Sequence, residues 1–172
     1  EALRPLIEAR ALAWAVVAVE PAEIDTLNIL RASFIAMHRA IAQLSTTPQH
    51  LLIDGNRFIP YPGIPHTCLV KGDGRFRSIA AASILAKTHR DARMRELDRL
   101  YEGYGFAQHK GYGTALHRER LDALGIPYYK PRVLLGKWSP ELVAPSWKDL
   151  DWNITAEVKR SGAFEVELLF QR

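Results

Sequence analysis

Two aspartates and a basic loop are the residues of this sequence best suited to chemistry on phosphate. The loop over residues 71–77 reads KGDGRFR and contains Lys71, Arg75 and Arg77 together with two glycines. Cations attract phosphate, and glycines let a backbone approach it closely. A helix expected to begin near Ser78 would add unpaired N–H groups and the positive end of its dipole. The loop is therefore a candidate binding site for phosphate groups.

The first aspartate, Asp91, lies within that expected helix, on the side that should face the core. At 100° per residue it is about 20° from Ile84 and about 60° from Met94 around the helix axis. An inward carboxylate needs a metal ion, an arginine or backbone donors, because an unpaired buried charge is costly. The alternative is a structural ion pair with Arg90, Arg95 or the basic loop.

The second aspartate, Asp54, ends a short apolar run. Residues 50–54 read HLLID, and the Gly-Asn that follows is a turn signal. The apolar residues do not alternate with polar ones, which is typical of a central strand in an α/β sheet, and ligands bind at the carboxyl end of such strands. The alternative is a β-hairpin, because Asp-Gly is a common connector and residues 66–70 also have strand-like composition.

The elements that must position these residues alternate between helix and strand. The expected elements are a helix over 1–10, a strand over 13–19, a helix that begins near Pro21, strands over 50–54 and 66–70, a helix over 78–101, and a helix over 116–124 that stops at Gly125. In the second helix, one buried stripe is predicted from Leu30, Phe34, Met37, Ile41 and Leu44. This order of elements favours the α/β class.

Glycines, aromatic residues and cations are combined in the segment before the last helix, which reads YEGYGFAQHKGYGT. Aromatic rings can stack on a sugar or a base, and His109 and Lys110 can neutralise phosphate. The alternative is core packing, which the pattern favours for Tyr101 and Phe106. It is less favoured for Tyr112, which lies between two glycines.

The composition is that of an ordinary soluble protein, with 172 residues, 48% hydrophobic residues and 24% charged residues. Its apolar runs are shorter than the roughly 20 residues that a membrane span requires, so no membrane partner is expected. With one cysteine, Cys68, no internal disulfide is possible, and we expect a cytoplasmic protein without a secretory signal. Residues 71–99 contain eight Lys or Arg and four Asp or Glu, which favours a polyanionic partner there.

Three motifs together resemble the type 2 ribonuclease H family, ribonuclease HII. They are LIDGN at 52–56, KGD with SIAAASILAKTHRD within 71–91, and YGFAQHKGYGT at 104–114. The run EIDTLNILRAS at 23–33 also fits, and the resemblance covers about residues 1–125. It implies a ribonuclease H-like mixed sheet flanked by helices, with a helical C-terminal part.

The resemblance also implies an activity, namely endonucleolytic cleavage of the RNA strand in RNA–DNA hybrids and at ribonucleotides embedded in duplex DNA, for DNA replication and repair. Asp54 and Asp91 would be catalytic residues that hold Mg²⁺ or Mn²⁺, consistent with the preference of these ions for oxygen ligands. Tyr112 would pack on the deoxyribose beside the ribonucleotide, and a monomer is expected. The expected substrate-binding residues are Lys71, Arg75, Arg77, Lys110 and Tyr112.

The sequence departs from the family pattern at both ends. Family members begin with a strand that carries Asp-Glu-Ala-Gly-Arg-Gly, whose two acids complete the metal cluster, and this segment is absent here. We therefore expect an incomplete ribonuclease H-like domain over 1–137 that lacks N-terminal strands and activity of its own, and a C-terminal arm of unknown role over 138–172. The alternatives are a non-catalytic nucleic-acid-binding fragment and an enzyme completed by a partner chain at the exposed sheet edge.

Overall fold

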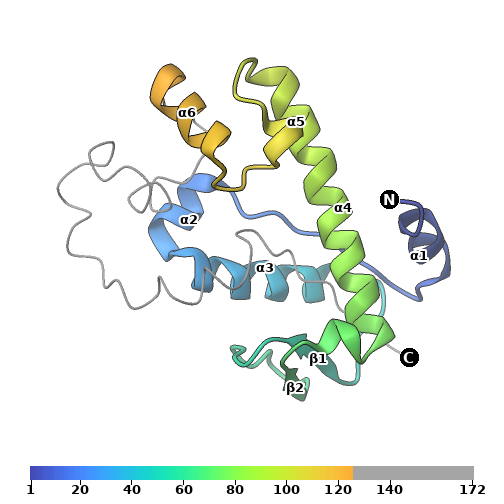
Figure 1. The fold of residues 1–172 in the computed structure, drawn as a ribbon. Coiled ribbons are helices and arrows are strands. Elements are labelled where there is room, and N and C mark those ends of the chain that lie inside the picture. The colour runs from blue at the N-terminus through green and yellow to red at the C-terminus, as the bar shows by residue number, and fades with distance from the viewer. Residues whose placement is uncertain (126–172) are drawn as a thin grey trace. The chain divides into compact units, whose positions relative to one another are not determined.

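The computed structural model describes residues 1–125 in two units, whose elements are labelled in Figure 1. The described parts of the first unit are Glu1–Ala18 and Ser33–Arg90, and those of the second are Val19–Ala32 and 91–125. Two helices, α3 (Ile29–Gln43) and α4 (Arg77–Leu100), contribute residues to both units. The expected C-terminal arm over 138–172 lies outside the described residues.

The sheet of the first unit consists of two parallel strands, β1 (Leu51–Asp54) and β2 (His66–Leu69). The register joins Leu51 to His66 and Asp54 to Leu69. The hairpin alternative is wrong, because a tight turn joins only antiparallel strands, whereas residues 55–65 connect the end of one strand to the start of the next. The two carboxyl ends consequently lie at the same edge of the sheet.

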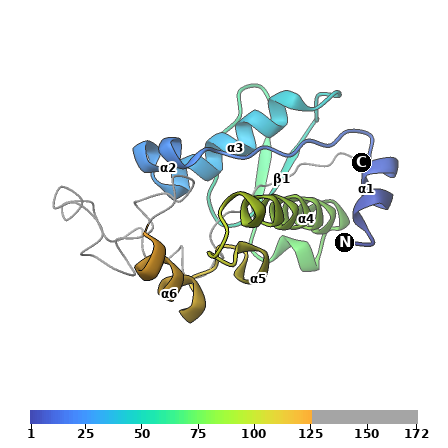
Figure 2. The ribbon, with the colours of Figure 1, turned by 90° about the horizontal axis from the view of Figure 1, so that it is seen from above.

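Helix α1 (Arg4–Arg10) lies alongside the first half of α4, as Figure 2 shows. The contact is apolar, since Ile7 packs against a buried cluster of small and aliphatic α4 residues. A polar contact reinforces it: the Glu8 carboxylate binds Nε of Arg4 at 2.7 Å and Nε2 of His89 at 3.0 Å. The hydrogen bonds from Arg4 and, to a lesser degree, His89 lower the pKa of Glu8, although burial acts in the opposite direction.

The predicted helix after Pro21 forms, but it is divided into α2 (Pro21–Leu27) and α3. Asn28 separates them with a φ of 70°, a conformation that a helix does not contain. The predicted core stripe is confirmed at its centre, where Phe34, Met37 and Ile41 are buried. Leu30 is only half-buried, and Leu44 is half-buried and lies beyond the end of α3.

The predicted strand over residues 13–19 is wrong, since this segment belongs to no strand. Its side chains nevertheless alternate as in an extended chain, with Ala15 and Val17 buried and Trp14 partly exposed. A strand also requires a neighbouring strand to complete its hydrogen bonds, and none pairs with this segment in the described part of the chain.

The second unit adds α5 (Phe106–His109) and α6 (Ala115–Leu124). Its core contains Met94 and Leu97 of α4, with Phe106 fully buried against them. The prediction that the last helix stops at Gly125 is confirmed, and this glycine has a φ of 80°.

The α/β class is therefore confirmed. The described part is mostly helical with a small parallel sheet, which is consistent with a ribonuclease H-like fold that lacks some of its strands. No helix among residues 1–125 is long and apolar enough to cross a membrane.

Candidate functional site

Asp54 lies at the carboxyl end of β1, beside the basic loop that follows β2. Its Oδ1 accepts a hydrogen bond of 2.9 Å from the backbone N–H of Gly72. The N–H of Gly55 donates to the carbonyl of Leu69 at 3.0 Å, which extends the parallel pairing past the aspartate. Asp54 and the loop are thus neighbours, because the parallel pairing brings residues 54 and 72 to one edge of the sheet.

The loop makes this contact through a tight turn, the 3₁₀ helix η1 (Gly72–Gly74). Lys71 precedes it in the left-handed conformation, with φ 56° and ψ 42°, and its side chain is exposed. For a residue with a side chain this conformation costs about 1 kcal/mol. A Cβ on Gly72 would lie 2.5 Å from Cδ1 of Ile79 and 3.3 Å from Cβ of Leu69, so only glycine fits this position without a shift.

The other oxygen of Asp54, Oδ2, has neither a hydrogen bond nor an ion pair within the described residues. The half-buried carboxylate is thus held in position through one oxygen while the second can bind a cation. No group of three or more His, Cys, Asp or Glu side chains arranged to hold a metal occurs among residues 1–125. A metal ion at Asp54 would therefore need ligands from substrate, water or other parts of the protein.

Asp91 is half-buried on α4 and belongs to the second unit, whereas the preceding residue, Arg90, belongs to the first. Asp91 was predicted to share the core-facing side of the helix with Ile84 and Met94. The burial of these two residues agrees with that prediction, since Met94 is buried and Ile84 is half-buried. Convergence of Asp91 with Asp54 on one metal site stays a prediction.

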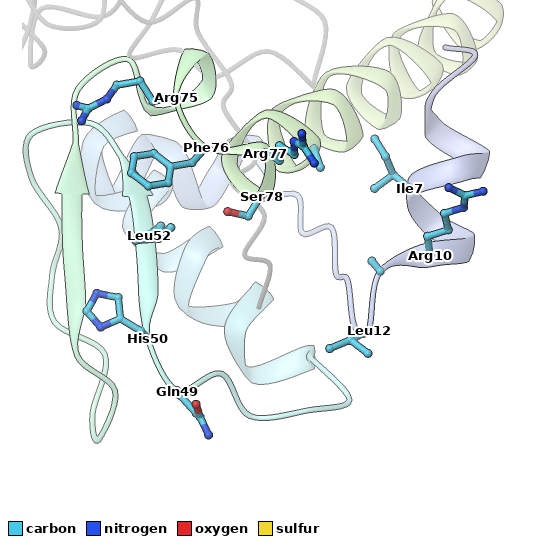
Figure 3. A pocket seen from close by; sticks show the side chains of 12 residues that line it. Ile7, Arg10, Leu12, Gln49, His50, Leu52, Arg75, Phe76, Arg77 and Ser78 are labelled. Atoms are coloured by element: carbon cyan, nitrogen blue, oxygen red, sulfur yellow. The ribbon is translucent and has the colours of Figure 1, made fainter. Parts of the chain in front are cut away.

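Arg75 and Arg77 line a pocket of about 1150 Å³ in the first unit, shown in Figure 3. The guanidinium carbon of Arg75 lies 5.7 Å from the ring centroid of Phe76, within the range of a cation–π contact. Figure 3 shows Arg77 extending toward α1, whose Arg10 also lines the pocket. Lys71 is not among the residues that line the pocket. The sequence did not indicate Arg10, because only the fold brings it beside the loop.

Lys110 and Tyr112 belong to the loop between α5 and α6 in the second unit. Lys110 is the C-cap residue of α5 and has a φ of 52°. Tyr112 is 37% exposed. The core-packing alternative is confirmed for Phe106, which is fully buried, and for Tyr101, which packs against the same cluster. Tyr112 is the aromatic residue that this loop presents to solvent.

Sequence reasoning misjudged one residue of this segment and missed another. His109, expected to neutralise phosphate, is 5% exposed, and His117 is fully buried. The two rings stack with their centroids 4.1 Å apart and their planes at 11°. The sequence gives little sign of this pair, because His109 ends α5, His117 lies in the first turn of α6, and a loop separates the two helices.

The comparison with known sequences agrees with the motifs. The sequence model of the Ribonuclease HII family matches residues 1–148. The chain belongs to the ribonuclease HII family. This is a family of ribonucleases of the H type, which are hydrolases that act as nucleases.

Similar proteins named Ribonuclease HII occur in several bacteria. The protein of Parabacteroides distasonis is 62% identical over 134 residues, which cover 77% of this chain and 67% of the relative. That of Bacteroides thetaiotaomicron is 60% identical over 130 residues, or 75% and 65% of the two chains. That of Phocaeicola vulgatus is 54% identical over 145 residues, or 84% and 72%. The chain thus spans about two thirds of the length of these relatives.

Proposed function

We propose that this chain carries part of the active site of an endonuclease that cleaves the RNA strand of RNA–DNA hybrids and duplex DNA at embedded ribonucleotides. The observation that carries the proposal is the position of Asp54. Its carboxylate lies at the carboxyl end of a parallel strand, where α/β folds bind ligands, and the N–H of Gly72 holds one of its oxygens. The cationic side chain of Lys71 follows the neighbouring strand at the same edge.

Asp54 and Asp91 are the proposed ligands for Mg²⁺ or Mn²⁺. The donor set fits these hard cations, because carboxylate oxygens suit them better than they suit zinc. When bound, two such ions would activate the attacking water and stabilise the leaving 3′-oxygen while the bond between phosphorus and that oxygen breaks. The role of Gly72 is to fix the orientation of the Asp54 carboxylate, so that its other oxygen is directed consistently.

The substrate-binding side chains fall into two proposed classes. Lys71, Arg75, Arg77 and Lys110 would neutralise backbone phosphates, which supply affinity without sequence information. Tyr112 would pack its exposed ring on the deoxyribose next to the ribonucleotide. A duplex partner is favoured by the excess of positive charge over residues 71–99.

The carboxylates proposed here are too few for a complete two-metal site. We expect the 172 residues alone to cleave slowly or not at all, and to become active when extended by a segment carrying the family's Asp-Glu-Ala-Gly-Arg-Gly. The proposed setting is a monomer in the cytoplasm, in keeping with the single cysteine, Cys68.

The test is cleavage of a duplex with one embedded ribonucleotide in Mg²⁺ or Mn²⁺, using the chain and its extended form. Asp54→Asn should lower the cleavage rate of the extended form by at least about 100-fold, because it removes a metal-binding charge. Its amide oxygen can still accept from Gly72, so folding should persist. The matched control is Asp73→Asn, an exposed aspartate of the same turn, which should keep activity. An inactive extended form, or full activity of Asp54→Asn, would reject the proposal.

A second candidate function, binding of nucleic acid without cleavage, is favoured by the small number of carboxylates. It predicts that the chain binds a hybrid duplex with an affinity that falls steeply as salt rises, and that no product forms in either metal. Failure to bind at low salt would contradict it.

A further inference from the structure

Two buried histidines contact the backbone of the loop that presents Tyr112. The Nδ1 atom of His117 lies 2.8 Å from the Tyr112 carbonyl oxygen. The N–H of Gly111 donates to Nδ1 of His109 at 3.1 Å, and Nε2 of His109 lies 2.8 Å from the carbonyl oxygen of Tyr104. Two successive residues of the loop are thus held by imidazole nitrogens rather than by regular secondary structure.

These contacts determine which nitrogens carry protons. Nδ1 of His109 must be unprotonated, because a backbone N–H points at it, and its Nε2 must carry a proton to donate to the carbonyl of Tyr104. His117 must carry a proton on Nδ1, since the atom facing it is the carbonyl oxygen of Tyr112. The contacts thus place a proton on Nε2 of His109 and on Nδ1 of His117, which are different nitrogens of the two rings.

The backbone of Tyr112 is held at several points. Its N–H donates to the carbonyl of His109 at 2.9 Å. Its carbonyl oxygen accepts both from Nδ1 of His117 and from the N–H of Thr114, at 2.8 Å each. The side chain, by contrast, remains 37% exposed. A fixed backbone sets the direction of the Cα–Cβ bond of Tyr112 and so restricts where its exposed ring can lie before any ligand arrives, which lowers the entropic cost of binding.

The histidine pair is in turn fixed by the core of the second unit. Both rings meet the buried ring of Phe106 edge-on, His109 at 5.5 Å and His117 at 5.9 Å between centroids. Because both histidines are buried, loss of a hydrogen-bond partner would leave a polar group away from water, at a cost that keeps the loop in this conformation. Burial thus couples the packing of Phe106 to the position of Tyr112.

We propose that His109 and His117 are positioning residues that hold Tyr112 in the orientation with which it meets the sugar beside a ribonucleotide. This inference rests on the proposed function for the role of Tyr112 and goes beyond it in assigning the residues that orient the ring. Neither histidine touches the reacting atoms in this scheme.

The experiment compares two variants of His117 that test the contribution of its aromatic ring and that of its hydrogen-bond donor independently. His117→Phe keeps a buried ring but loses the Nδ1 donor, and His117→Asn loses the ring but keeps an N–H near the same place. The readout is the ratio of dissociation constants for an all-DNA duplex and the same duplex with one ribonucleotide, measured with the full chain. Thermal unfolding checks that each variant folds.

His117→Phe should lower this ratio about three- to tenfold, the effect of losing one hydrogen bond, and His117→Asn should retain it. Tyr112→Ala should abolish the preference, with no further loss when His117→Phe is added. An unchanged ratio in His117→Phe, or an equal loss in both variants, would overturn the inference.

Nitrogen NMR tests the positioning independently of nucleic acid. The imidazole signals should show the proton of His109 on Nε2 and that of His117 on Nδ1, and exchange of the Gly111 amide should accelerate in His109→Phe. Opposite tautomers to these, or unchanged Gly111 exchange, would overturn the inference even if binding is lost. If the wild-type chain binds both duplexes equally, the proposed role of Tyr112 is rejected. The imidazole signals and the Gly111 exchange rate would then be the test of whether the two histidines position the loop.

Discussion

Gly72→Ala is the substitution that most directly tests the contact between the basic loop and Asp54. The added Cβ would lie 2.5 Å from Cδ1 of Ile79, 3.3 Å from Cβ of Leu69 and 3.5 Å from Oδ1 of Asp54. Carbon atoms pack at about 3.5–4.0 Å, so the turn or the isoleucine must move by roughly 1 Å. A shift of the turn also lengthens the 2.9 Å hydrogen bond from Gly72 to the carboxylate.

The expected cost follows from these two effects. Overpacking of a well-packed site costs about 1–3 kcal/mol, and a weakened hydrogen bond to a charged group adds to it. Gly72→Ala should therefore lower the free energy of unfolding by roughly 2 kcal/mol, or lower the melting temperature by about 4–8 °C for a chain of this size. Gly74→Ala is the matched control, since nothing lies within 4 Å of its Cβ position.

The assay is urea unfolding of the single variants and of a double variant with Ile79→Val, which removes the methyl group that meets the new Cβ. Alone, Ile79→Val should cost about 1 kcal/mol. Combined with Gly72→Ala it should cost less than the sum, with a coupling of about 1 kcal/mol. Equal effects of Gly72→Ala and Gly74→Ala, or strictly additive costs in the double variant, would show that the added Cβ does not clash with Ile79.

Three further predictions concern other parts of the described structure. Because Arg4 and His89 lower the pKa of Glu8 below 4.5, the stability from this group is present above about pH 4.5 and is lost as the pH falls through its folded pKa. Glu8→Gln should then destabilise the protein by less than about 1 kcal/mol at pH 7, and by less still at pH 3.5 in urea unfolding; an equal cost at both pH values would contradict this. Lys71→Gly should raise the melting temperature, because glycine adopts the left-handed conformation without the cost of about 1 kcal/mol that lysine incurs. The same substitution should weaken duplex binding at low salt, since it removes a positive charge. A lower melting temperature would argue against backbone strain at Lys71. Thr114→Ala should cost about 1 kcal/mol in thermal unfolding, because its side chain caps α6 at 3.2 Å, whereas Thr114→Ser should be close to wild type, and equal losses would exclude the capping role.

Features that depend on near neighbours in the chain could be predicted from the amino-acid sequence alone. The α3 stripe of Phe34, Met37 and Ile41 follows from helical periodicity, and the stop of α6 at Gly125 follows from glycine's access to positive φ. The family, too, could be assigned from ordered motifs, since these are properties of the chain and not of its folding.

Features that depend on residues distant in the chain became evident only from the folded protein. Composition could not distinguish a hairpin from the parallel pairing of β1 and β2, because both use the same apolar runs, and the parallel register is what brings Asp54 to Gly72. Nor could it separate the buried His109 from the exposed Tyr112, three residues apart in a polar, glycine-rich segment. Burial is set by which side chains close over a residue, here Phe106 and His117, and those contacts exist only once the second unit is folded.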